Sequence, residues 1–309
     1  MAAWWVPGDM SKAVTPDWIA LDWGTTNLRG WAMQGSAVLG QARSNDGMGA
    51  LAPDAFGPAL ERLTAGWTVA PHTPVIACGM VGSRQGWAEA PYRAVPCTPL
   101  AADFVTTHSS LGPVQIIAGL RQDAPPDLMR GEETQIAGFL AMNPGWDGVI
   151  CLPGTHTKWV EVSAGEVVSF QTFMSGEIFA LLSEQSVLRH SVTTDEWDAD
   201  AFSDAVNDSI SRPERIAARL FSIRAADLLR ATPPGSARAR LSGLLIGAEL
   251  AASRPYWLGR QIALLGACVQ STHYAAALQT QGVPATVADA DRMTLAGLTA
   301  AYRLWKDIT

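Results

Sequence analysis

Two segments of this sequence, about 130 residues apart, share one design, and this repeat constrains the fold more than any other feature. The first is an apolar strand over 18–24 that passes through a Gly/Thr-rich turn into a return strand over 28–33. The second is an apolar strand over 148–152 that passes through a Gly-Thr-x-Thr turn into a return strand over 157–162. Two such hairpins in separate halves of one chain predict an internally duplicated domain that holds a nucleotide between its halves.

The turn of the first hairpin contains the residue types that bind phosphate and a hydrated metal ion. Gly24 permits a close backbone approach, and Thr25 and Thr26 offer hydroxyl and N–H donors. Asp22 can orient a hydrated Mg²⁺, which keeps several waters and uses few carboxylate ligands. A short Gly/Thr turn beside an Asp also occurs in ordinary hairpins, so this turn alone leaves a structural role open. The second hairpin is what favours phosphate binding.

The composition is compatible with a compact enzyme and disfavours two classes of partner. The 309 residues suffice for two domains of ordinary size, and the 48% of apolar residues can fill two cores. The formal charge of −7 and the lack of a Lys/Arg cluster disfavour a nucleic-acid partner. No apolar stretch reaches the roughly 20 residues that span a bilayer. We therefore expect a small-molecule partner, neither nucleic acid nor membrane, and leave a homodimer open.

The N-terminal residues and the cysteines indicate a compartment. Residues 1–16 lack the basic and apolar regions of a signal peptide, and we expect them to form a short disordered leader. The cysteines form no CxxC pair, which is typical of thiols in a reducing compartment; they are Cys78, Cys97, Cys151 and Cys268. We therefore expect a cytoplasmic protein.

Strand and helix patterns divide the chain into two related halves. The first half is expected to form three strands, a helix, a strand and then shorter strands, over 18–24, 28–33, 37–43, 53–66, 75–79, 92–95 and 114–119. The second half is expected to begin with a helix over 132–142, to repeat the three strands over 148–152, 157–162 and 166–172, and to add helices near 176–189, 199–211, 214–230 and 236–253. It ends with strand 261–266, helix 272–281, strand 285–287 and helix 291–305. We place an N-terminal lobe at 17–130 and a C-terminal lobe at 131–309.

Three motifs in this order resemble the sugar kinase, hsp70 and actin superfamily. The run Asp22-Trp23-Gly24-Thr25-Thr26-Asn27-Leu28-Arg29 resembles its first phosphate motif, and Leu152-Pro153-Gly154-Thr155-His156-Thr157-Lys158 resembles its second. Leu264-Leu265-Gly266-Ala267-Cys268, before a helix, resembles its adenosine motif. The resemblance implies an α/β fold of two ribonuclease-H-like lobes, the actin-like ATPase fold, with ATP in the cleft between them.

Within that superfamily the chain is most similar to the 2-dehydro-3-deoxygalactonokinases. The similarity covers about residues 18–305, and the runs that carry it are 79–87, 130–135, 152–159 and 241–249. It implies ATP-dependent phosphorylation of the terminal (6-) hydroxyl of 2-dehydro-3-deoxy-D-galactonate in galactonate catabolism. Such a transfer passes through a loose transition state, so the protein must align the two substrates, spread charge and orient one hydroxyl.

The resemblance also assigns nucleotide contacts. Asp22 would hold a water-coordinated Mg²⁺, and Thr25 and Thr26 would lie near the γ-phosphate. The second turn would cradle the β-phosphate, and the adenosine motif would leave space for the adenine and ribose; these residues are Gly154, Thr155 and Thr157, and Gly266 and Ala267. Lys158 would add a point charge, although a Lys at the start of a return strand often points outward.

The resemblance places a catalytic base at the start of the helix before the second hairpin. Many related sugar kinases have Gly-Asp there, whereas this chain has Gly131-Glu132, followed by Glu133. The longer side chain of a glutamate can still reach a primary hydroxyl, and either Glu132 or Glu133 is a candidate. Both also suit a helix N-terminus for purely electrostatic reasons.

The acceptor would carry a carboxylate, which calls for a guanidinium or backbone amides. Arg84 is the better candidate because it lies in a Gly-rich loop able to fold close to a small ligand. Ser83 and Trp87 of the same loop would contact the substrate as well. Arg29 on the first return strand would either face the cleft or form a structural ion pair.

Other chemistries find little support in the sequence. The chain contains no GxxxxGK[ST], HExxH or GxSxG motif, and the segment 47–52 fits GxGxx[GA] without a clear βαβ strand before it. The five histidines show no metal-ligand spacing, and His156 alone lies in a candidate site. Two alternatives stay open: a kinase of another acceptor, such as 2-dehydro-3-deoxygluconate or an amino sugar, and a chaperone-like ATPase switch.

Overall fold

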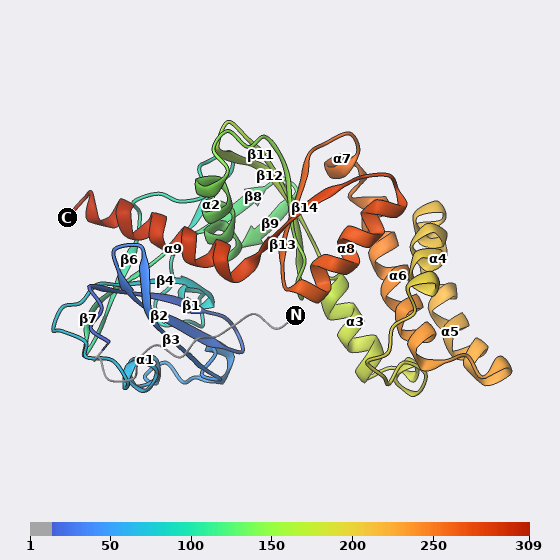
Figure 1. Ribbon diagram of the computed structural model, residues 1–309, viewed down its shortest axis with the longest axis horizontal. Coiled ribbons are helices and arrows are strands. Elements are labelled where there is room, and N and C mark those ends of the chain that lie inside the picture. Colours follow the sequence, from blue (N-terminus) through green and yellow to red (C-terminus); the bar gives the residue numbers. More distant parts are fainter. Residues whose placement is uncertain (1–13) are drawn as a thin grey trace.

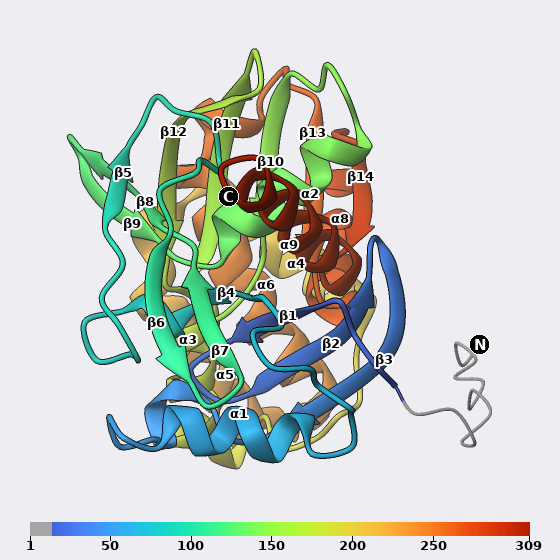
Figure 2. The same ribbon diagram turned by 90° about the vertical axis from the view of Figure 1, so that its left-hand side faces the viewer.

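The computed structural model describes residues 14–309, apart from the side chain of Cys268, and contains two lobes, each built around a mixed β-sheet (Figures 1 and 2). The first sheet has the strand order β3-β2-β1-β4-β7-β6, and the second has the order β12-β11-β10-β13-β14. In both sheets an antiparallel three-stranded meander continues into parallel strands. The shared topology confirms the duplication that the two hairpins predict.

The first sheet forms from the strands expected near the N-terminus. They are β1 (Trp18–Trp23), β2 (Leu28–Gln34), β3 (Ala37–Ser44) and β4 (Val75–Gly79), with α1 (Phe56–Thr64) between β3 and β4. β1 is nearly all buried because it lies between β2 and β4, which explains its continuous apolar sequence. The register sets Asp22 opposite Arg29, so the first hairpin presents an acid and a base side by side.

The end of the first half differs from the expectation. The single strand expected over 114–119 is two strands in different sheets, β7 (Gly112–Ile116) and β8 (Gly119–Asp123). Gly119 allows the change of sheet, because a Cβ there would lie 2.6 Å from the carbonyl oxygen of Met129. The sequence analysis also missed β6 (Val105–Ser109) and β9 (Pro126–Met129), short strands whose residues are exposed or half-buried apart from Met129.

The second sheet repeats the plan of the first and adds a helical insert. Its strands are β10 (Gly148–Leu152), β11 (Thr157–Ser163), β12 (Glu166–Phe173), β13 (Ile262–Gly266) and β14 (Ala285–Asp289). The helices between β12 and β13 are α3 (Ser175–Glu184), α4 (Ala199–Ser211), α5 (Ile216–Arg230), α6 (Pro234–Ala252) and α7 (Arg254–Trp257), and α8 (Cys268–Thr280) follows β13. α4 and α6 pack through two glycines of α6, since a Cβ on Gly243 would lie 2.5 Å from the Phe202 carbonyl oxygen. Figure 1 shows the insert standing apart from the first lobe.

Two parts of the chain pack against the half of the molecule to which they do not belong in sequence. The small sheet of β5 (Tyr92–Ala94), β8 and β9 contributes Leu120 and Met129 to a core shared with β10 and β11. α9 (Ala290–Lys306) follows β14 but lies on the first sheet, where Tyr302 stacks on Trp18 with ring centroids 4.3 Å apart. The division of the chain at residue 130 stays a prediction, and these segments cross it.

Two helices cross between the lobes at very close range. α2 (Glu132–Met142) packs on α9, and a Cβ on Gly138 would lie 1.9 Å from the Met293 carbonyl oxygen. A Cβ on Gly297 would lie 1.9 Å from the Thr134 carbonyl oxygen. The contact therefore requires glycine on both helices, and Asp291 in the first turn of α9 reaches Arg29 of the first hairpin.

The described part of the chain contains no helix that is both long and apolar enough to traverse a bilayer. The leader expected over 1–16 falls mainly on residues 1–13, which lie outside the described residues. Val14, the first described residue, forms a parallel bridge to Trp67.

Candidate active site

The first hairpin brings Asp22 into contact with Arg29 at the end of β1. Nε of Arg29 donates to Oδ2 of Asp22 at 3.1 Å, and Nη2 donates to the same oxygen. Nη1 donates to Asp291 in the first turn of α9. Burial disfavours the guanidinium charge, but the neighbouring carboxylates of Asp22 and Asp291 outweigh that effect and raise the pKa of Arg29. Arg29 is therefore an ion-paired cation in the described structure.

The turn between β1 and β2 packs against a second glycine-containing segment, residues 47–49. Thr25 and Thr26 are exposed, and the amides of Met48 and Gly49 donate to the carbonyl oxygens of Gly24 and Thr25, each at 2.9 Å. A Cβ on Gly47 would lie 2.2 Å from the backbone of Thr26. The GxGxxA run of the sequence therefore supports this turn from behind, which gives its first glycine a steric reason.

The Asp22 carboxylate faces the end of β4 and the start of α2. Sγ of Cys78 donates a weak hydrogen bond to Oδ1 of Asp22 at 3.9 Å, and burial followed by the Asp22 charge raises the pKa of this thiol. A Cβ on Gly79, which has φ +91, would lie 3.3 Å from the same Oδ1. Gly131 packs on Gly79, where a Cβ would be 3.4 Å from the Gly79 Cα. Glycines thus keep this carboxylate accessible.

Glu132 and Glu133 occupy different environments at the N-terminus of α2. Glu133 is fully buried, and its carboxylate accepts from the Gly131 amide at 2.7 Å and from the Thr134 hydroxyl at 3.1 Å. Burial, and then the charge of Glu132, raises the pKa of Glu133 to about 8. Glu132 accepts from the Arg130 amide at 3.0 Å and keeps part of its surface exposed. Desolvation also raises the pKa of Glu132, opposed by Lys158 and His156 of the second hairpin.

The second hairpin presents some of its expected residues to solvent and turns others inward. Gly154 and Thr155 lie at the turn, where the Glu177 amide of α3 donates to the Thr155 carbonyl at 2.9 Å. Thr157 is buried, and its hydroxyl bonds to the Tyr274 hydroxyl at 2.9 Å. Lys158 is also buried and donates from Nζ to Oγ1 of Thr172 at 2.8 Å. Only the turn itself is therefore placed to touch a phosphate directly.

A cavity of about 460 Å³ opens beside the second turn, between α3, α6 and α8. Its walls combine the turn with aromatic and polar side chains; they include Gly154, Gly176, Phe179, Trp197, Arg238, Ile246, Gln270, His273 and Tyr274. Gly266 and Ala267 of the adenosine motif do not line it. Gly266 instead packs against the second turn, because a Cβ on Gly266 would lie 3.3 Å from Cδ of Pro153. This close approach places the start of α8 next to the turn.

The sequence analysis missed the residues of the helical insert that line this cavity. Trp197 stacks on His273 with ring centroids 3.9 Å apart and an interplanar angle of 8°. The Arg238 guanidinium lies 5.1 Å from the Phe179 ring centroid. Burial, and then the Arg238 charge, lowers the pKa of His273, which favours its neutral form. These residues come from four separate helical or loop segments, so no local pattern marks them.

The Gly-rich loop after β4 places its candidate residues in three different settings. Arg84 is 81% exposed, and its Nε lies 3.6 Å from Oε1 of Glu89. The Trp87 ring stacks on Phe56 at 5.9 Å between centroids and belongs to the core of the first lobe. Ser83 is buried, and its hydroxyl has no hydrogen-bond partner among residues 14–309. Arg84 alone is thus free to reach a ligand without rearrangement of the core.

Arg130 holds the end of this loop through contacts to Ala90 and Tyr92. The sequence analysis missed this role, although the residue lies in the 130–135 run. Its Nη2 donates to the Ala90 carbonyl at 2.7 Å, and its Nε donates to the Tyr92 hydroxyl at 3.3 Å. The guanidinium also lies 4.2 Å from the centroid of the Tyr92 ring. The conformation of the loop therefore depends on the residue directly before Gly131.

The donor set at Asp22 fits a metal ion held through water. Among the described residues, no three His, Cys, Asp or Glu side chains are grouped so that they could hold a metal ion. One partly exposed carboxylate at the end of β1, beside a turn of exposed threonines, suits a hydrated Mg²⁺ that takes its other ligands from phosphates.

Comparison with known proteins gives a consistent result. The model of the 2-keto-3-deoxy-galactonokinase family matches residues 22–301. The chain is 39% identical over 299 residues to a probable 2-dehydro-3-deoxygalactonokinase of Rhizobium meliloti (strain 1021), with 93% of this chain and 97% of the relative covered. It is 36% identical over 289 residues to the 2-dehydro-3-deoxygalactonokinase of Escherichia coli (strain K12), with 92% and 97% covered.

Solved structures agree with the fold. A crystal structure of a candidate 2-dehydro-3-deoxygalactonokinase from Sinorhizobium meliloti superposes with a TM-score of 0.88 at 38% identity, covering 93% of this chain and 98% of that one. The activator of 2-hydroxyisocaproyl-CoA dehydratase from Clostridium difficile, solved with bound ADPNP, gives a TM-score of 0.56 at 13% identity, with 94% and 96% covered. The expected fold, two lobes of the actin-like ATPase type, is confirmed.

Proposed function

The chain belongs to the 2-keto-3-deoxy-galactonokinase family, and we propose that it transfers the γ-phosphoryl group of ATP to the terminal (6-) hydroxyl of 2-dehydro-3-deoxy-D-galactonate in galactonate catabolism. The position of the α2 N-terminus carries the proposal. Gly131, directly before α2, packs on Gly79, and Gly79 in turn packs beside Oδ1 of Asp22 on the first hairpin. On the other side, the charges of Lys158 and His156 of the second hairpin lower the pKa of Glu132 against the effect of burial. Two adjacent acids thus lie between the two candidate phosphate-binding turns.

We propose Glu132 as the catalytic base. Glu132 is only partly buried as a residue, whereas Glu133 is fully buried and commits both oxygens to Gly131 and Thr134. Glu132 would accept the proton of the acceptor hydroxyl as that oxygen bonds to the γ-phosphorus and ADP departs. The desolvation that raises its pKa makes it a stronger base than a carboxylate in water. Glu133 would orient the backbone at Gly131.

The nucleotide would lie across the two turns, with its base in the 460 Å³ cavity. The exposed Thr25 and Thr26 suit the γ-phosphate, and the amides at Gly154 and Thr155 suit the β-phosphate. Thr157 would act by fixing the turn through Tyr274, since its hydroxyl faces inward. Asp22 would hold the hydrated Mg²⁺, which neutralises phosphate charge in such transfers.

The substrate carboxylate would bind the loop after β4. Arg84 supports this assignment because its guanidinium is exposed and has only a loose contact to Glu89. A carboxylate ligand could replace that contact with a charge-assisted pair. Arg130, through its hydrogen bond to Ala90, would fix the loop that carries Arg84.

A cytoplasmic location remains our expectation, in keeping with the free thiols of Cys78, Cys97 and Cys151.

ADP release with Mg²⁺ and ATP tests the proposal against a panel of acceptors. The panel contains 2-dehydro-3-deoxygalactonate, 2-dehydro-3-deoxygluconate, galactonate, N-acetylglucosamine and no acceptor. We expect turnover with the first compound to exceed that with every other. Preference for another acceptor would contradict the substrate, and ADP release that ignores all acceptors would indicate an ATPase switch instead of a kinase.

A further inference from the structure

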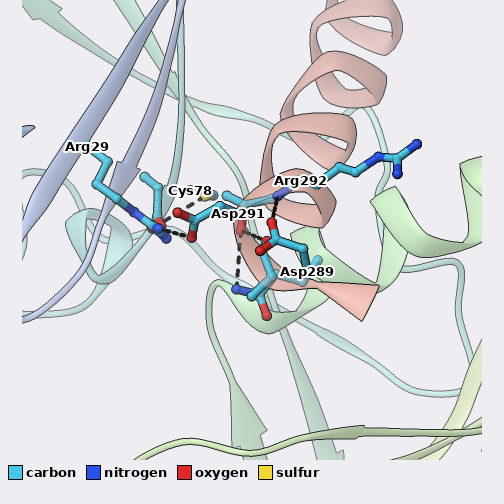
Figure 3. Close-up of polar contacts among 9 residues, drawn as sticks. Arg29, Cys78, Asp289, Asp291 and Arg292 are labelled. Atoms are coloured by element: carbon cyan, nitrogen blue, oxygen red, sulfur yellow. Dashed lines mark hydrogen bonds and ion pairs between the residues drawn. The ribbon is translucent and has the colours of Figure 1, made fainter. Parts of the chain in front are cut away.

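Arg29 lies between the carboxylates of Asp22 and Asp291, which come from opposite ends of the chain, and Figure 3 shows Arg29 beside Asp291. One edge of its guanidinium, Nε and Nη2, donates to Oδ2 of Asp22 on the neighbouring strand. The remaining nitrogen, Nη1, donates to Oδ1 of Asp291 at the start of α9. A single cation is therefore shared between the first phosphate hairpin and a helix that begins beside the second sheet.

The two ion pairs differ in their exposure to solvent. The side chains of Arg29 and Asp22 are 19% and 17% exposed, whereas that of Asp291 is 58% exposed. The ion pair between Asp22 and Arg29 is thus largely shielded from solvent, whereas the Asp291 carboxylate that contacts Arg29 is largely exposed to solvent. Since shielding strengthens an ion pair, the contact to Asp22 is the stronger one in this arrangement.

Asp291 is not needed to cap its helix. The N-cap of α9 is Asp289, whose Oδ1 accepts from the Arg292 amide at 2.8 Å (Figure 3). Asp291 also lies in the first turn, but its carboxylate turns toward Arg29 on the other lobe. The role of its carboxylate should therefore be sought at Arg29.

The contact to Arg29 conflicts with the task proposed for Asp22. Arg29 occupies Oδ2 of Asp22, and the Cys78 thiol approaches Oδ1 at 3.9 Å. Two donors of Arg29 fill the lone pairs of Oδ2, so only Oδ1 stays open to the water shell of a cation. For Asp22 to offer both oxygens to hydrated Mg²⁺, Arg29 must give up its contact with Oδ2, and it needs another anion if it is to stay in the cleft.

We propose that Asp291 is a positioning residue that retains Arg29 when Asp22 turns to hydrated Mg²⁺. The inference rests on the proposed function, and it deepens it. Arg29 would keep its Nη1 contact to Asp291 while its Nε and Nη2 edge leaves Asp22 and becomes available to phosphate oxygens. Without Asp291, the Asp22 carboxylate would be the sole partner of Arg29, and the guanidinium would compete directly with the metal ion.

The substitution Asp291→Asn tests this role by direct binding of the metal. Mg²⁺ is titrated into the protein saturated with ADP, and the heat of binding gives its affinity without turnover. We expect the affinity of D291N to be about fivefold to tenfold weaker than that of the unmodified protein, the usual size of a coupling between contacting residues. The kcat at saturating Mg²⁺ should change by less than about twofold, because Arg29 and Asp22 are both intact.

Two controls separate positioning from a general effect of charge. Asp289→Asn removes the same charge two residues away, and asparagine caps a helix about as well as aspartate, so its Mg²⁺ affinity should equal that of the unmodified protein. In an Arg29→Gln background, D291N should have no further effect on Mg²⁺ affinity, since Asp291 then has no guanidinium to retain.

The outcomes distinguish this inference from the proposed function. Equal Mg²⁺ affinity of D291N and the unmodified protein would overturn the inference while leaving the kinase reaction intact. The effect of D291N on Mg²⁺ affinity could also persist in the Arg29→Gln background, or D289N could reproduce it. Either result would show that the lost negative charge alone weakens Mg²⁺ binding, and it would overturn the inference as well. Failure of the unmodified protein to phosphorylate any acceptor would instead count against the proposed function.

Discussion

At the scale of single residues, the two adjacent glutamates offer a matched comparison. We predict that Glu132→Gln lowers kcat by about 10²–10⁴-fold with little change in KM, the usual contribution of a general base. Glu133→Gln should retain kcat to within about tenfold, because Glu133 is fully buried and its protonated form resembles glutamine. Steady-state ADP release from both variants measures the difference. Similar losses in both would contradict the assignment of Glu132.

The raised pKa of Glu133 also has a consequence for stability. Its folded-state pKa of about 8 lies above its ordinary 4.5, so its contribution to stability is fully present below pH 4.5 and is lost as pH rises through 8. Glu133→Gln cannot ionise, and we expect it to be more stable than the unmodified protein at pH 8 by on the order of 4 kcal/mol, with the gain disappearing toward pH 4.5.

Urea unfolding of both proteins at several pH values measures this gain. Glu184→Gln, at the exposed end of α3, serves as the control and should leave the pH profile unchanged. Parallel profiles for E133Q and the unmodified protein would show that the Glu133 carboxyl does not change its ionisation on folding.

Arg84 is the residue that we expect to recognise the substrate carboxylate. Arg84→Ala should raise the acceptor KM about tenfold and leave the KM for ATP unchanged, because a charge-assisted hydrogen bond to an exposed group contributes roughly 1.5 kcal/mol. Arg121→Ala is a matched control: that arginine is also exposed and lies 3.5 Å from a neighbouring carboxylate, Asp123. Equal KM values for R84A and R121A would leave the carboxylate to another group.

At the scale of elements, the crossing of α2 and α9 is the most demanding contact. We predict that Gly138→Ala and Gly297→Ala each lower the free energy of unfolding by about 3 kcal/mol, since each added Cβ would lie 1.9 Å from a carbonyl oxygen of the facing helix. Gly66→Ala, where a Cβ meets nothing within 4 Å, should cost little. Denaturant titration compares the three, and a Gly138→Ala protein as stable as Gly66→Ala would contradict the close crossing.

At the scale of the whole molecule, we expect the lobes to close on their substrates, because a kinase must exclude water from the transferred phosphoryl group. A compact chain of this length has a radius of gyration of roughly 19 Å, and an open two-lobed form should exceed that value. Small-angle scattering of the Glu132→Gln variant, which keeps both substrates intact, should show a smaller radius with ATP and acceptor together than with either alone. An unchanged radius would count against closure.

Much of the fold is readable from local sequence because the signals are local. The range expected for α2, 132–142, is the range observed, and each hairpin strand ends within one or two residues of its expected position. An apolar run followed by a Gly/Thr turn specifies a hairpin wherever it lies in the chain. The family resemblance rested on the same short runs, and the comparisons confirm it.

The sequence by itself thus determined the duplicated plan, the two phosphate-type turns and the family of this protein. Tertiary structure alone decided which partners these residues take: Arg29 pairs with Asp291 from 262 positions away, Thr157 turns inward to Tyr274, and α9 lies on the first sheet. These outcomes depend on which distant groups pack together and how deeply each is buried. Local periodicity carries no information about either, because one pattern of residues is compatible with many long-range partners.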